Sequence, residues 1–65
     1  MENRKDIRDF RVNVLNFTQL QLSKRLRVSR SSIAMYEKGD RIPSEKFWTK
    51  LEKRLGYKKE DLKDL

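Results

Sequence analysis

Apolar side chains recur along this chain at helical spacing, and charged residues fill the positions between them. This period, with charged residues on the remaining faces, is typical of short helices that each bury one stripe. The predicted helices cover residues 3–15, 19–26, 30–38, 45–55 and a last short segment from about residue 59. The side chains that we expect in the core are Ile7, Phe10, Val14, Leu22, Leu26, Ile33, Tyr36, Phe47, Leu51 and Leu55.

The segment from residue 18 to residue 39 predicts two helices joined by a sharp turn. Thr18 and Gln21 have the spacing of a capping box, in which each side chain bonds the backbone N–H of the other residue. Ser29 is placed to cap the second helix. Only two residues and the caps separate the two helices, and such a short link favours the steep crossing of a helix-turn-helix.

Other residues mark further helix ends. Gly39 and Gly56 follow predicted helices and can adopt the left-handed conformation that terminates them. Ser44 is a good N-cap for the fourth helix. Lys58 stands where the last helix needs a hydroxyl, so the start of that helix has no cap.

Charge changes this picture from a plain helical domain to one with a candidate partner. The chain has 17 Lys and Arg against 10 acidic residues, a formal net charge of +7. Such an excess on 65 residues favours a polyanionic partner such as nucleic acid, although 42% charged residues also suit a solvated helical surface. One domain, residues 1–65, is all that this length predicts.

Composition also excludes several classes of function. The chain lacks cysteine and histidine, which rules out disulfides, zinc fingers and imidazole bases. Glu60, Asp61 and Asp64 cluster without partners that would make a metal or acid-base site, so we expect a solvated face, no cofactor and no catalysis. No apolar run approaches the about 20 residues that span a bilayer, and no secretory signal is present, so we expect a cytoplasmic protein without membrane contact.

The ordered spacing of one set of residues resembles a known family. These residues are Thr18, Gln19, Leu22, Ser23, Leu26, Val28, Ser29, Ile33, Glu37, Gly39 and Pro43. Together they resemble the helix-turn-helix family of phage Cro and repressor proteins, also called the xenobiotic-response-element type. The resemblance covers about Ile7 to Leu62. It implies an all-α, compact five-helix, lambda-repressor-like domain, usually a homodimer on a two-fold-related DNA operator.

Some positions are structural in that family, and two depart from its pattern. Ser23 stands where relatives have a small residue against the recognition helix, and Arg11 and Glu37 resemble a pair that links the first and third helices. Arg27 replaces the usual turn glycine, at a cost of about 1 kcal/mol if left-handed; a phosphate contact is one explanation. The segment 11–19 is one residue longer than usual, which leaves the Arg11 register open by one.

The resemblance places the start of the recognition helix, residues 30–38, in the major groove. The positions that match base-contacting residues are Ser29, Arg30, Ser31, Ala34 and Met35. Arg30 is the strongest candidate because a guanidinium can donate two hydrogen bonds to guanine; the alternative is a solvated side chain. Met35 fits either a contact with a thymine methyl or a half-buried place in the core.

Two further groups of residues follow from chemistry and resemblance. Phosphate contacts favour helix starts and basic loops, and the candidates are Gln19, Ser32, Lys38, Arg41, Ser44 and Lys46. The apolar residues that we expect at a dimer contact are Trp48, Tyr57, Leu62 and Leu65. Trp48 and Tyr57 could instead stack single-stranded bases, but both fall within the apolar pattern, which favours core or dimer roles.

The sequence therefore predicts a repressor-like transcriptional regulator that binds specific double-stranded DNA as a homodimer on a two-fold operator. Two alternatives stay open. One is an antitoxin-like or anti-repressor module that uses the same scaffold to bind a protein. The other is a non-specific nucleic-acid binder.

Overall fold

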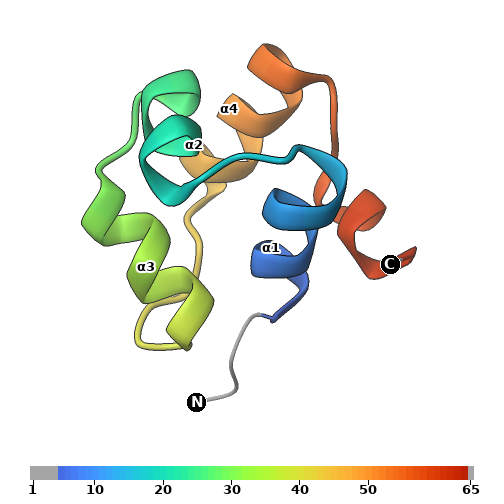
Figure 1. Cartoon of the computed structure of the whole chain (residues 1–65). Coiled ribbons are helices and arrows are strands. Elements are labelled where there is room, and N and C mark those ends of the chain that lie inside the picture. The colour runs from blue at the N-terminus through green and yellow to red at the C-terminus, as the bar shows by residue number, and fades with distance from the viewer. Residues whose placement is uncertain (1–4, 65) are drawn as a thin grey trace.

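Short helices follow one another along the chain, and the described residues contain no strand. The computed structural model describes residues 5–64 (Figure 1). Its elements are α1 (Lys5–Asp9), the π-helical turn η1 (Phe10–Val14), α2 (Gln19–Leu26), α3 (Arg30–Lys38), α4 (Glu45–Leu55) and the 3-10 turn η2 (Lys59–Asp64). The all-α class is confirmed, whereas the predicted fifth helix is a 3-10 turn. None of the described helices is long and apolar enough to cross a bilayer.

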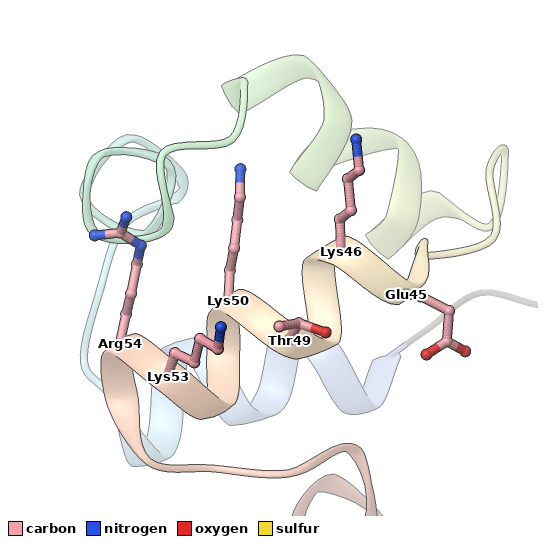
Figure 2. A pocket seen from close by; sticks show the side chains of 6 residues that line it. All are labelled: Glu45, Lys46, Thr49, Lys50, Lys53 and Arg54. Carbon is pink, nitrogen blue, oxygen red and sulfur yellow. The ribbon is translucent and has the colours of Figure 1, made fainter.

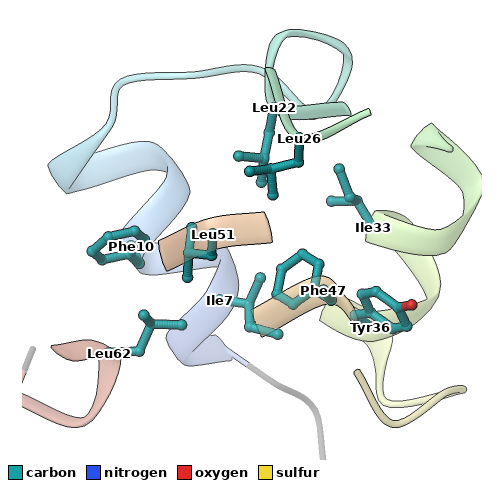
Figure 3. Close-up of a cluster of buried hydrophobic side chains, with 9 residues drawn as sticks. All are labelled: Ile7, Phe10, Leu22, Leu26, Ile33, Tyr36, Phe47, Leu51 and Leu62. Atoms are coloured by element: carbon teal, nitrogen blue, oxygen red, sulfur yellow. The ribbon is translucent and has the colours of Figure 1, made fainter. Parts of the chain in front are cut away.

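One core joins all of these elements. Its buried side chains are Ile7, Phe10, Leu22, Leu26, Ile33, Tyr36, Phe47, Leu51 and Leu62. Figure 3 shows these nine side chains converging from the N-terminal helix, α2, α3, α4 and the C-terminal turn. Helix α1 packs against α3 and η2, and α2 packs against α3 and α4. Of the ten residues predicted for the core, Leu55 is partly buried and Val14 lies outside it.

Helices α2, α3 and α4 begin where their caps predict. Thr18 Oγ1 accepts a hydrogen bond from Gln21 N at 3.1 Å, and Gln21 Oε1 accepts one from Thr18 N at 2.8 Å. Ser29 and Ser44 cap α3 and α4 by accepting from the N–H three residues further on, at 3.0 and 3.3 Å. Both helices end on the predicted glycines, whose φ angles are 85° and 79°. Local hydrogen bonding therefore sets these boundaries.

The first helix widens from α to π after Asp9. Leu15 N donates to Phe10 O at 3.1 Å, five residues back, and Phe17 N donates to Arg11 O at 3.0 Å. The wider turn absorbs one extra residue and brings Leu15 against the core, in the place that Val14 would take in a continuous α-helix. Val14 is 38% exposed, so its predicted place in the core is wrong.

The C-terminal segment closes the core from the α1 side. In place of a capping hydroxyl at Lys58, Asp61 Oδ2 accepts the Lys58 N–H at 2.7 Å at the start of the 3-10 segment. Leu62 is 2% exposed and belongs to the core, so its predicted place in a dimer contact disagrees with its burial. Tyr57 packs edge-on against Phe10, with ring centroids 4.9 Å apart.

Candidate nucleic-acid interface

Helix α3 has one face in the core and the opposite face in solvent. Ile33 and Tyr36 are buried, whereas Ser31 and Lys38, one helical repeat of seven residues apart, are exposed. Ala34 lies between them on the same face and is partly buried. The helix therefore presents a continuous solvent face along its whole length.

The structure gathers four of the five predicted base-contacting residues on this side of α3. Arg30 and Ser31 are exposed, and Ala34 and Met35 are half-buried. Met35 is not among the residues that pack against the core. An exposed guanidinium at the first turn and a thioether more than one turn later are thus both accessible from the solvent side.

The serines at the start of α3 bond to each other. Ser29 Oγ accepts from Ser32 N at 3.0 Å, and its hydroxyl donates to Ser32 Oγ at 2.8 Å. Ser29 was predicted to contact bases and Ser32 a phosphate. In the structure the two side chains bond to each other, and Ser29 Oγ also caps the start of α3.

The turn between α2 and α3 is contacted by Lys50 of α4, a residue that the sequence analysis did not single out. Arg27 takes the left-handed conformation, with φ 55° and ψ 44°, and its side chain is exposed. Lys50 Nζ, from α4, donates to the Arg27 carbonyl at 3.0 Å. No local signal points to this contact, because the two residues are 23 positions apart. The cation satisfies a carbonyl that the helix end leaves without an intrahelical partner.

A buried ion pair between Arg11 and Glu37 joins the η1 turn to the end of α3. Arg11 Nε donates to Glu37 Oε2 at 2.7 Å and Nη2 donates to Oε1 at 3.1 Å, while Nη1 donates to Phe17 O at 2.9 Å. The two side chains are 10% and 5% exposed. These hydrogen bonds confirm the predicted Arg11–Glu37 contact. Arg11 keeps its register because the π turn absorbs the extra residue. This bidentate geometry fixes the end of α3 relative to the first helix.

The predicted phosphate-binding residues lie around the solvent face of α3. Gln19 Nε2 donates to Glu37 Oε1 at 3.1 Å, which leaves the second hydrogen of that amide for another acceptor. Lys38, Arg41 and Lys46 are exposed. Ser44 Oγ is used as the cap of α4. Three cations and one amide therefore remain accessible to an anion.

Helix α4 carries four basic residues on one side, and of these only Lys46 was predicted to contact a phosphate. A shallow pocket on this helix is lined by Glu45, Lys46, Thr49, Lys50, Lys53 and Arg54. In Figure 2 the side chains of Lys46 and Lys50 extend toward α2 and α3, and Glu45 points away from them. Lys53 and Arg54 lie in the last turn of α4, at the opposite end of the helix from Lys46, and are not part of the proposed interface.

The aromatic residues considered for stacking or dimer contacts lie against the core. Trp48 packs edge-on against Phe47, with ring centroids 5.0 Å apart, and Tyr57 packs against the core as well. Both rings are partly buried, which favours a structural role over single-strand stacking. Leu65 lies outside the described residues. Among the side chains of residues 5–62, no three acidic groups come together as a potential metal site.

This fold and this surface define a helix-turn-helix DNA-binding domain. The helix-turn-helix family profile matches residues 7–62, most of the chain, and the chain therefore belongs to this family, of the Cro/C1 type. Domains of this family bind DNA and are typically not enzymes. No curated protein and no solved structure matches the chain significantly.

Proposed function

We propose that the protein is a transcriptional regulator that binds specific double-stranded DNA sites through α3. The observation that carries this proposal is the solvent face of α3, where Arg30 and Ser31 are exposed beside the half-buried Ala34 and Met35. A helix fits the major groove, whose base edges present distinct donors, acceptors and methyl groups. Arg30 donates two hydrogen bonds to a guanine, and Met35 packs against a thymine methyl.

Phosphate contacts set the position of α3 in the groove. Gln19 at the start of α2 holds one backbone strand, and Lys38, Arg41 and Lys46 hold the backbone around the loop between α3 and α4. These groups are exposed or retain a donor, and backbone contacts of this kind fix register without carrying sequence information. Regulation then follows from occupancy of the operator, which blocks or recruits other DNA-binding proteins.

Two copies bind a two-fold-related operator in this proposal. Leu62 is buried, so the contact uses the partly exposed edges of Trp48 and Tyr57. Sedimentation of the protein with and without its selected duplex tests the stoichiometry. A single copy per duplex at high protein concentration would contradict the dimer and leave DNA binding itself intact.

Selection of bound duplexes from a random library, followed by affinity measurement at two salt concentrations, tests the function. We expect a defined motif and a preference of about 10³-fold or more over random duplex. A steep salt dependence without preference would support a non-specific binder. Binding to neither duplex would support a protein-interaction module.

Two variants separate base contacts from backbone contacts. Arg30→Ala is expected to relax the preference at one position of each half-site, by about 1 to 3 kcal/mol. Arg41→Ala is expected to weaken selected and random duplexes alike. An unchanged selected motif for Arg30→Ala would show that another residue recognises the bases.

A further inference from the structure

A second basic surface adjoins the recognition helix on the side of α1. It is a cleft between α1 and α3, here called the α1–α3 cleft, and it is lined by Lys5, Arg8, Gln19, Ala34, Glu37 and Lys38. Lys5 and Arg8 are three positions apart in α1 and therefore neighbours on one side of the helix. Both are exposed, and neither was singled out from the sequence.

The cleft carries a net positive charge because its carboxylate is already neutralised. Both oxygens of Glu37 accept hydrogen bonds from Arg11, and Oε1 also accepts one from Gln19. Asp6 and Asp9 of α1 do not line the cleft. Among the described residues that line the cleft, Lys5, Arg8 and Lys38 therefore surround a single acidic group, Glu37, which is paired.

The cleft is continuous with the proposed DNA interface. Ala34, on the solvent face of α3, forms part of its wall, and Gln19 and Lys38 are candidates for phosphate contacts. The Gln19 amide retains one hydrogen beyond its bond to Glu37. A duplex that lies along α3 therefore brings backbone phosphates to the mouth of this cleft.

We propose that Lys5 and Arg8 bind a backbone phosphate of the duplex, together with Gln19, at the α1–α3 cleft. This inference rests on the proposed function and adds α1 to the DNA-binding surface. Helix α1 packs against α3, and the buried Arg11–Glu37 pair ties the η1 turn that continues α1 to the same helix, so the two cations lie beside the recognition helix. Arg8 donates through its planar guanidinium and Lys5 supplies a point charge.

The test compares two pairs of substitutions that remove the same charge. Lys5→Ala with Arg8→Ala removes one Lys and one Arg from the cleft, and Lys53→Ala with Arg54→Ala removes the same pair from α4. We expect the α1 pair to weaken binding to the selected duplex about tenfold and to reduce the salt slope by about 1, as the loss of one phosphate contact predicts. The α4 pair should change both quantities much less. The selected motif should stay the same, because a phosphate contact carries no sequence information.

A neutral phosphate locates the contact on the DNA. We expect duplexes that each carry one methylphosphonate in the selected site to reveal one position that matters. At this position the modification lowers the affinity of the parent, but it does not lower the affinity of the α1 pair below its value for the unmodified duplex. Lys5→Arg with Arg8→Lys keeps both charges and should retain most of the affinity. Melting curves of all variants should match the parent, since the replaced side chains are exposed.

Equal losses for the α1 and α4 pairs would overturn the inference, because only net charge would then matter. The inference would also be overturned if every methylphosphonate that weakens binding of the parent weakened binding of the α1 pair to the same extent. These results leave the proposed function standing if the parent prefers its selected motif. A parent without sequence preference would instead contradict the proposed function.

Discussion

Arg27 holds a left-handed conformation that costs a residue with a Cβ about 1 kcal/mol or more. Asn16 does the same at the end of the first helix, but its short polar side chain tolerates this region better. The Lys50 bond to the Arg27 carbonyl stabilises the turn from outside, through the backbone and not through the arginine side chain. The contact explains how the turn is held, and it gives no reason for an arginine at this position.

Replacing Arg27 with glycine should therefore stabilise the domain. Glycine adopts the same φ and ψ without the Cβ penalty, and the Lys50 bond to the carbonyl is retained. We expect the free energy of unfolding to rise by about 1 kcal/mol, or the melting temperature by about 4 to 8 °C. A lower melting temperature would mean that the Arg27 side chain itself contributes to the fold. DNA affinity of the same variant tests whether Arg27 contacts a phosphate.

Glu37 offers a second prediction at this scale. Glu37→Gln keeps the shape of the side chain but leaves Arg11 as a buried, unpaired charge. Breaking such a pair on one side should lower the free energy of unfolding by about 3 to 5 kcal/mol, measured by urea denaturation. The double variant Arg11→Met with Glu37→Met removes both charges and should lose less than Glu37→Gln alone. A larger loss for the double variant would contradict this account.

The π turn is the element that departs most from a regular helix. It lengthens the first helix by one residue while Ile7, Phe10 and Arg11 stay inward. With one residue fewer, the bond from Phe17 N to Arg11 O would span five residues, as in the Schellman motif that ends many helices around a left-handed residue such as Asn16. The extra residue is therefore an insertion into an otherwise regular helix end.

Deletion of Asn13 should accordingly be tolerated. The deletion lets η1 close as an α-helix and leaves Leu15 in contact with the core. We expect a cooperative melting curve and a far-UV spectrum close to those of the parent. Deletion of Thr49 is the control, because it rotates Leu51 out of the core and should unfold the domain. Loss of folding on deletion of Asn13 would show that the π turn is itself required.

At the scale of the whole molecule, the small core is closed by the last turn. Leu62 packs on the α1 side, far along the chain from α2 and α3, and it is among the largest fully buried side chains. Its burial places Leu62 among the residues that hold the fold together, apart from the residues proposed to contact DNA. The C-terminal segment therefore acts first as part of the fold.

Leu62→Ala tests this role. Truncation of a fully buried leucine should lower the free energy of unfolding by about 2 to 5 kcal/mol. The loss should be the same at low and high protein concentration, because the side chain is buried within one chain. A loss that depends on concentration would return Leu62 to the dimer contact. Leu62→Met is the matched control and should cost less.

The sequence by itself determined the local structure. The capping residues Thr18, Ser29 and Ser44 and the glycines after α3 and α4 act within a few residues of themselves, so the helix boundaries could be derived from spacing. The apolar period identified nearly all of the core, and the accessible side of α3 followed from the same period. The basic net charge indicated the class of partner.

Only the tertiary structure decided how distant residues meet. The Arg11–Glu37 contact joins residues 26 positions apart and fixes the first helix on α3. The helix then widens between Phe10 and Leu15, so Leu15 and not Val14 contacts the core. The Lys50 contact at the turn and the α1–α3 cleft likewise join segments that have no local relation. Caps and apolar periodicity involve residues that are close together in the sequence, so they can be derived from it. Contacts between helices join distant residues and depend on how the whole core packs.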